Sequence, residues 1–563
     1  MNQQSIKKQQ LFSFLLVTAI VVVVNILSSY VFTRIDLTED KRFTLSSNTK
    51  ELMKQLDDVV FFKIYLEGDL PPDFKRLRNE VEDKLAEMRI YSNGNLGYEF
   101  IDAAAIENEQ QREALYKQLY QKGLMPTTLQ LKENDASTQK IIFPGAIINS
   151  NNLEQAITFL QEQMGVGDAQ MLNNSIRNLE YQITSTVKKI TQKAPYQLCF
   201  LEGQGELPNE RVGDINKTLS ESYVVQRKAI NGLLGALDNY RVVIIAKPDT
   251  AFTEKDKFVL DQYIMKGGRV LWLIDQAHAS MDSLASSDEA IATSVDLNLN
   301  DMPFRYGARV NFNLLCDLQG VPIPIITGNV GNQPKFTMVP WMYFPMIFPG
   351  ANHAIVNNLN ALKTEFISTI DTIAVQGVKK TFLLYSSPYS RELNLPSRFT
   401  LEAARKKPNM TLYDNGRKAV AVLLEGNFTS TYKNRIPPAI ANDSAIAFKE
   451  TSKPTKMIVM SDGDIISNNV NKSNGQIYPC GYDRYNNRMF GNKSLMLNMI
   501  DFLADDSNLI ELRNKEVKLR LLDKNLIAEN EMPIKLINVG VPILLLLIFG
   551  IAKFAIRKRR YAS

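Results

Sequence analysis

The side chains with catalytic potential in this chain are few and lie far apart. The sequence holds two histidines, His278 and His353, and three cysteines, Cys199, Cys316 and Cys480. A nucleophilic cysteine needs a tight strand-to-helix turn and a histidine base nearby. Cys199 instead lies inside the apolar run QLCFLEG, Cys316 lies in NLLCDLQG without a G-x-C-x-G elbow, and Cys480 follows a proline. The sequence has no CxxC pair, and we expect the cysteines to be buried structural thiols. One disulfide between two of them stays as the alternative.

One acid–base pair can be drawn from the sequence. His278 follows Asp275 in LIDQAHAS, at the end of an apolar strand. The two side chains could serve as the base and its orienting carboxylate in a membrane-anchored hydrolase or amidase. A solvated loop histidine explains the same spacing without catalysis. We therefore predict a protein that is not an enzyme, and the hydrolase stays as the alternative.

Two acidic turns follow predicted strands, where ligands bind in open α/β sheets. The first, EGQGE over 202–206, is not a phosphate loop, because its carboxylates would repel an anion and no G-K-S/T follows. The second, DGD over 462–464, could give two oxygens to a hard cation, but a capped turn predicts the same residues. No Walker motif occurs, so we expect this chain to bind no nucleotide. Because a capped turn accounts for the acidic residues, we also expect no metal and no other cofactor.

A segment rich in prolines and aromatic residues is the third candidate. Residues 332–350 read NQPKFTMVPWMYFPMIFPG. This composition is typical of an irregular segment laid over a core, and a docking strip for a partner or membrane surface is the alternative. The ligand or partner surface that we predict comprises Glu202, Gly203, Gly205, Glu206, Asp275, His278, Trp341, Asp462 and Asp464.

Two uncharged apolar runs flank these candidates, one from Leu11 to Phe32 and one from Leu536 to Ala552 with a flank to Ile556. Each has about the ~20 residues that span a bilayer. Lysines precede the first run and RKRR follows the second, and such bases favour the cytoplasm. We predict transmembrane helices over 11–33 and 536–556, with both termini (1–10 and 557–563) cytoplasmic. A cleaved signal peptide is the weaker alternative for the first run.

Alternating strand and helix patterns fill the middle of the chain. They predict a membrane-proximal helix over 34–56, a small thioredoxin-like α/β domain without its CxxC over 57–150, and two linking helices over 151–195. The segments YQLCFLEG, VVQRKAI, YRVVIIAKP and GGRVLWLID then predict a parallel, doubly wound sheet in a large domain over 196–505. We expect a helix from Thr253 to Met265, a polar flexible insertion over 279–300, and a membrane-proximal linker over 506–535.

Composition restricts the partners. The 563 residues include 65 Lys and Arg against 60 Asp and Glu. Five of the bases lie in the C-terminal tail, so the middle of the chain is nearly neutral. This balance argues against a nucleic-acid partner.

Six ordered blocks, bracketed by the two apolar runs, resemble the gliding-motility ABC-transporter auxiliary family (GldG). They include RIDLTEDKRFTLS, FLEGQGEL, YIMKGGRVLWLID and MSDGDIISNNV. The resemblance implies an auxiliary or substrate-binding subunit in the cytoplasmic (inner) membrane, with its large domain in the periplasm. It implies an ABC-2 type permease and a cytoplasmic ABC ATPase as partners, together with other cell-envelope proteins. It also implies that the large domain is similar to an intraflagellar-transport-related, glutamine-amidotransferase-like domain.

Overall fold

The computed structural model describes two compact units of the chain. One unit combines Met1–Arg42 with Glu516–Ser563, and the other is Phe43–Lys515. The described residues are 12, 14–24, 44–133, 136–161, 164, 167–192, 194–284, 287, 289–331, 333–350, 353–413, 416–437, 443–444, 446–471, 473–507, 509–514 and 530–561.

The first unit contains the terminal apolar helices. Helix α13 (Glu531–Tyr561) includes an apolar stretch over Glu531–Ile556, 26 residues long and exposed throughout, which is long and apolar enough to cross a membrane. Near the N-terminus the structure describes a shorter apolar helix, Phe14–Val24. The rest of the first predicted span lies outside the described residues, so the two-span arrangement stays a prediction.

The N-terminal part of the second unit is built on a mixed sheet in the order β2-β1-β5-β6. Strands β1 and β2 are parallel, and β5 is antiparallel to both β1 and β6. The bounds are α2 (Ser47–Lys54), β1 (Val60–Ile64), α3 (Pro72–Tyr91), β2 (Leu96–Phe100), α4 (Glu109–Gln121), β5 (Gly145–Ser150), β6 (Leu153–Thr158) and α5 (Asp168–Thr191). A separate hairpin joins β3 (Thr127–Glu133) to β4 (Ala136–Ile142). Ser46 caps α2 as predicted, and its hydroxyl accepts a hydrogen bond from the Thr49 amide.

The prediction of two helices between 153 and 192 was wrong. Residues Leu153–Thr158 form β6, and a single helix, α5, follows. The turn before β6 explains the difference, because Asn151 and Asn152 both have positive φ, 47° and 64°. Two such residues form the tight hairpin turn that suits twisted antiparallel strands. Helix α5 packs its apolar stripe, including Leu179, Ile183 and Val187, into the core under this sheet.

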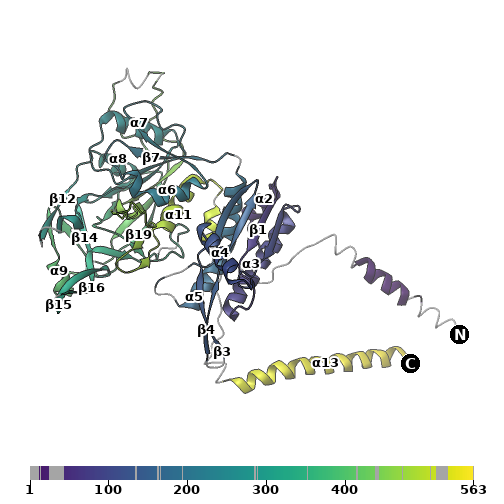
Figure 1. The fold of residues 1–563 in the computed structure, drawn as a ribbon. Helices are drawn as coiled ribbons and strands as arrows, with labels where there is room; N and C mark the ends of the chain where they lie inside the picture. The colour runs from purple at the N-terminus through teal and green to yellow at the C-terminus, as the bar shows by residue number, and fades with distance from the viewer. Residues whose placement is uncertain are drawn as a thin grey trace. The chain divides into compact units, whose positions relative to one another are not determined.

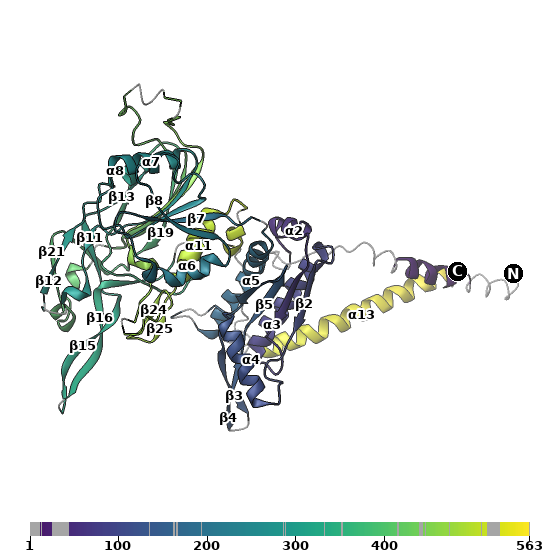
Figure 2. The same cartoon turned by 45° about the horizontal axis from the view of Figure 1, so that its top comes forward.

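A seven-stranded sheet in the order β19-β22-β23-β10-β9-β7-β8 forms the centre of the larger part (Figures 1 and 2). Its five strands from β23 to β8 are parallel, and β22 and β19 are antiparallel additions at one edge. The strand bounds are β7 (Gln197–Glu202), β8 (Val224–Ala229), β9 (Val242–Ala246), β10 (Arg269–Leu273), β19 (Val378–Tyr385), β22 (Ala419–Gly426) and β23 (Thr455–Met460).

Helices cover both faces of this sheet, as a doubly wound arrangement requires. Alternate strand residues face opposite sides, so Phe200 packs with α6 (Gly213–Ser220) and α11 (Asn492–Ala504). Its neighbour Cys199 packs with α7 (Glu254–Met265) and α8 (Asp301–Tyr306) on the other face. The predicted helix from Thr253 to Met265 is confirmed, with Thr253 as its N-cap.

Short sheets replace the irregular segments that the sequence predicted. The polar insertion contains β12 (Glu289–Ser294), which pairs with β11 (Ala277–His278) just before the insertion and with β21 (Ser397–Thr400). The remaining elements are β13 (Ala308–Val310), β14 (Asn313–Asp317), β15 (Gly320–Val330), β16 (Gln333–Ile347), β17 (Leu362–Lys363), β18 (Ile370–Thr372), β20 (Ser390–Asn394), α9 (Glu402–Arg405), β24 (Tyr482–Asp483) and β25 (Arg488–Met489).

The proline-rich segment is strand β16, which forms a long hairpin with β15 that projects from the body of this unit (Figure 2). Pro322 lies directly opposite Pro340 in this hairpin. Because neither residue has an N–H, the pair occupies a position where the strands exchange no hydrogen bond. Prolines disrupt a strand where its N–H groups must donate hydrogen bonds, but at these positions they are compatible with strand β16.

A buried carboxylate fastens α7 to the elements around it. The Asp261 side chain is inaccessible to solvent and accepts hydrogen bonds from Tyr306 Oη (2.8 Å), Ser430 Oγ (2.6 Å) and the Thr431 amide (2.8 Å). Removal of the carboxylate would leave three buried donors without an acceptor.

We expect Asp261→Ala to lower the free energy of unfolding by about 3 kcal/mol, the cost of breaking a buried polar network. Denaturant unfolding of the full chain in detergent, followed by tryptophan fluorescence, measures the change. The matched control is Asp371→Ala, whose exposed carboxylate pairs with Arg309 and should contribute less than about 1 kcal/mol. Equal effects of the two substitutions would contradict this assignment.

Candidate functional site

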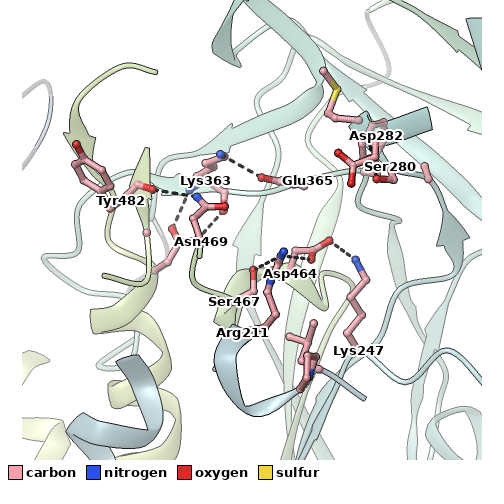
Figure 3. A pocket seen from close by; sticks show the side chains of 17 residues that line it. Arg211, Lys247, Ser280, Asp282, Lys363, Glu365, Asp464, Ser467, Asn469 and Tyr482 are labelled. Atoms are coloured by element: carbon pink, nitrogen blue, oxygen red, sulfur yellow. Dashed lines mark hydrogen bonds and ion pairs between the residues drawn. The ribbon is translucent and has the colours of Figure 1, made fainter. Parts of the chain in front are cut away.

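A cavity of about 450 Å³ opens at the carboxyl ends of the parallel strands (Figure 3). Lys247 follows β9, Asp275 follows β10, and Asp464 lies just beyond β23. This edge is where ligands bind in open α/β sheets. The lining residues are Leu207, Pro208, Arg211, Lys247, Ala279, Ser280, Met281, Asp282, Lys363, Glu365, Phe366, Asp464, Ser467, Asn469, Gly481, Tyr482 and Asn492.

A partly buried ion-pair cluster lies at the base of the cavity. Lys247 Nζ is 3.1 Å from Asp275 Oδ2 and also contacts the Asp464 carboxylate. The Gly463 amide donates a hydrogen bond to Asp275 Oδ1. One ammonium group therefore connects the ends of three neighbouring strands.

The backbone is constrained at two positions to bring these groups together. Lys247 has φ of 53°, in the left-handed region that favours glycine. A Cβ at Gly463 would lie 2.5 Å from the Lys247 Cβ, so only glycine fits there. Such constraints concentrate at sites where side-chain placement matters.

The pKa values in the cluster follow from its burial. Burial raises the pKa of Asp275 to about 6, although the Lys247 ammonium acts in the opposite direction. Burial and the carboxylates of Asp275 and Asp464 raise the pKa of Asp462 well above its ordinary value. Burial alone would lower the pKa of Lys247, but the Asp275 and Asp464 carboxylates raise it. The carboxylates therefore favour the charged form of Lys247, whereas burial and the neighbouring carboxylates disfavour the charged form of Asp462.

Lys363 forms a second cationic position on the cavity wall. Its Nζ lies 3.1 Å from Glu365 and 3.6 Å from Asp483. Burial opposes the charge, yet these two carboxylates raise the pKa of Lys363 above its ordinary value. The Asn492 side chain bonds to both the amide and the carbonyl of Lys363, which fixes this wall to α11.

The predicted site residues are only partly brought together. Asp275, Asp462 and Asp464 meet around Lys247, and Asp464 also lines the cavity. His278 is exposed on β11, where it pairs with Thr293, and it makes no hydrogen bond to Asp275 in the described structure. Trp341 is fully buried in the core beneath the β15–β16 hairpin, so it offers no surface for a partner.

The EGQGE turn after β7 is a tight structural turn beside the cavity. Gly203 and Gly205 have φ of 116° and 71°, and a Cβ at Gly205 would collide with Asp249. Glu202 pairs with Arg227, and Glu206 accepts a hydrogen bond from the Gln204 amide. Burial raises the pKa of Glu206. The Glu206–Gln204 hydrogen bond is internal to the turn, whereas Glu202 binds the neighbouring strand β8 through Arg227.

Lys247, Arg211, Asp282 and Lys363 were missed at the sequence level. Lys247 had a usable signal, because it directly follows the apolar strand VVIIA as Asp275 follows VLWLI. The other three had none, since each lies in a segment that shows no strand-end or motif pattern in the sequence.

The cavity holds no nucleophile in a catalytic setting. The three cysteines are free and buried, and burial raises the pKa of each thiol to about 12. The second histidine, His353, lies against the Phe502 ring and accepts a hydrogen bond from the Ile355 amide. Among the described residues, no group of three His, Cys, Asp or Glu side chains could hold a metal ion.

Comparisons with known proteins place most of the chain in families. Residues 196–499 match a family model described as "ABC-type uncharacterized transport system", and residues 39–149 match a domain of unknown function. An uncharacterized protein from Borreliella burgdorferi is 22% identical over 544 residues, which is 94% of each chain. A solved structure of the mmIFT52 N-terminal domain aligns with a TM-score of 0.32 and 13% identity, over 55% of this chain and 98% of that one.

The raised pKa of Asp275 predicts a pH signature in stability. The native carboxyl keeps its proton up to about pH 6, whereas an unfolded one releases it near 3.8. Between these values the native state binds more protons, so stability from this group falls as pH rises. We expect the wild-type free energy of unfolding, minus that of Asp275→Asn, to decline from pH 4 to pH 7.

The control for this measurement is Asp282→Asn, at an exposed carboxyl in the same cavity. Its difference from wild type measures how much of the pH dependence comes from removing any one carboxyl of this cavity. A flat difference for Asp275→Asn, or a rising one, would show that the carboxyl is not held protonated by burial.

Proposed function

The chain belongs to the family of ABC-type transport-system proteins that its residues 196–499 match, and we propose that it is a non-catalytic, membrane-anchored auxiliary subunit of an ABC transporter. In this proposal it binds a substrate outside the cytoplasm and works with an ABC-2 type permease and a cytoplasmic ATPase. The family match carries the proposal, because the matched segment contains the sheet and most of the cavity. The resemblance to gliding-motility auxiliary proteins favours a role in that process.

The geometry of the cavity favours binding over catalysis. Asp275 is engaged by Lys247 and the Gly463 amide, so it does not orient His278. The exposed His278 therefore lacks the carboxylate that the hydrolase alternative requires. A purely structural envelope scaffold would not need a polar cavity at the ligand-binding edge of its sheet.

The exposed apolar helix supports a membrane anchor. Its 26 residues extend about 39 Å at 1.5 Å per residue, enough for the ~30 Å hydrocarbon core. We propose a second anchor over 11–33, both termini in the cytoplasm, and a periplasmic middle containing a thioredoxin-like and an amidotransferase-like domain. The bases at both outer flanks support this topology.

We expect the C-terminal helix to bind the permease. Removal of residues 531–563 should leave the Phe43–Lys515 unit folded, because that unit is compact by itself, but should abolish recovery of the permease. Protection from proteolysis and permease pull-down, with the partners co-expressed, measure the two effects.

A control chain carries an unrelated transmembrane helix in place of 531–556, which restores the tether but not the specific contact. Full permease recovery by the truncated chain, or by this control, would refute a specific role for α13. Pull-down of the intact chain without permease or ATPase would refute the proposed function itself.

Membrane topology can be tested by cysteine labelling, since the three native thiols are buried. We expect Lys406→Cys, at an exposed position in the large unit, to react with a membrane-impermeant maleimide in cells whose outer membrane is permeabilised. Lys558→Cys, in the C-terminal tail, should react only after lysis. Labelling of Lys558→Cys in unlysed cells would contradict the two-span topology.

A further inference from the structure

We propose that the cavity binds a short peptide by its two charged ends. The inference rests on the proposed function, since it names the ligand class of a substrate-binding subunit. Some of the charged side chains that line the cavity already have close partners among the described residues, and others do not.

Two of the three cations are engaged within the protein. Lys247 is held by Asp275 and Asp464, and Lys363 by Glu365 and Asp483. Because a buried ammonium with two carboxylates is already neutralised, neither lysine is free to recruit an anion.

Arg211 is the cavity cation with capacity to spare. Its closest carboxylate contact is Asp464 Oδ1 at 3.9 Å, and its guanidinium donates one long hydrogen bond, 3.4 Å, to Ser467 Oγ. Its Nε is buried and has no hydrogen-bond partner among the described residues. A guanidinium with unused donors is suited to bind a carboxylate through two parallel hydrogen bonds.

Asp282 is the corresponding anion. It lies in the short turn after β11, in the 3-10 helix Met281–Leu284, and its carboxylate forms no ion pair with any residue that the structure describes. Figure 3 shows Asp282 well apart from Arg211 in the cavity, with Asp464 between them in the view. The cavity therefore presents one weakly paired cation, Arg211, and one carboxylate without an ion pair among the described residues, Asp282, at separate places.

The ligand that satisfies both groups is a zwitterion. A simple anion such as phosphate would leave the Asp282 carboxylate without a partner, and a simple cation would leave the spare donors of Arg211 unused. The remaining polar lining consists of neutral hydrogen-bonding side chains, such as Asn469, Ser467 and Ser280, which match the amides of a peptide backbone. A volume of about 450 Å³ lies within the range of small-ligand sites.

Blocked peptides test the two ends separately. Calorimetric titration of the full chain in detergent would compare trialanine with its N-acetylated form, which lacks the ammonium, and its C-amidated form, which lacks the carboxylate. We expect trialanine to bind and each blocked form to bind about tenfold more weakly, the effect of losing one charge-assisted contact.

Two variants assign the ends to their partners. The Arg211→Gln variant should bind C-amidated trialanine as well as it binds trialanine, but it should still bind N-acetylated trialanine more weakly. In Asp282→Asn, acetylation should no longer matter, whereas amidation still should. The control Arg309→Gln, at an exposed arginine paired with Asp371 away from the cavity, should bind all three peptides as wild type does.

Equal binding of the three peptides, no binding of trialanine at millimolar concentration, or variants that fail to cancel their own block would overturn the proposal. Recovery of permease and ATPase in the same preparation separates the two hypotheses. If the partners co-purify and trialanine does not bind, the ligand class alone is wrong; if they do not co-purify, the proposed function fails.

Discussion

The ion pairs of the partly buried Lys247 ammonium are the interactions on which the cavity depends. Lys247 joins the ends of β9, β10 and β23 through Asp275 and Asp464, and it is held in a left-handed backbone conformation beside a glycine that no other residue could replace. A buried cation is costly without partners, so the three strand ends must stay together for the native state to form. The cluster thereby fixes the cavity floor and leaves other charged groups available for a ligand.

This arrangement leaves Asp275 and the thiols without the contacts that an acid–base or nucleophilic role requires. Asp275 has a raised pKa, which is a property of many general bases, but both of its oxygens are already engaged inside the protein. The thiols are buried among apolar side chains, and the exposed histidine stands apart from any carboxylate partner in the described structure. The charged and polar groups at this edge of the sheet therefore shape a polar cavity.

The sequence predicted the parts of the fold that depend on local patterns. Continuous apolar runs such as VVIIA identified the parallel strands, and Thr253 identified the start of α7. Strand β16 was missed because prolines are compatible with a strand only at positions that donate no hydrogen bond to the neighbouring strand. Which positions these are depends on the pairing with β15, and that pairing cannot be predicted from one segment. Strand β6 was missed because six residues show too few periods to separate helix from strand.

The candidate site was predictable at its strand ends and not beyond. Asp275, Asp462 and Asp464 follow apolar strands, which was enough to select them. The role of Lys247 was hidden because its partner Asp464 lies 217 residues away in the sequence. Arg211 and Asp282 belong to no local motif. They were selected because of how little they pair with other described residues in the folded chain, which the sequence does not reveal.

If this chain is a functional auxiliary subunit of an ABC transporter, as we propose, its presence should change the rate at which the ATPase hydrolyses ATP. This rate is the most direct test of the proposal. The candidate permease and ATPase would be reconstituted in proteoliposomes with the full chain, without it, or with the chain truncated before residue 531. We expect the full chain alone to change the rate of ATP hydrolysis. An identical rate in all three preparations would contradict the account.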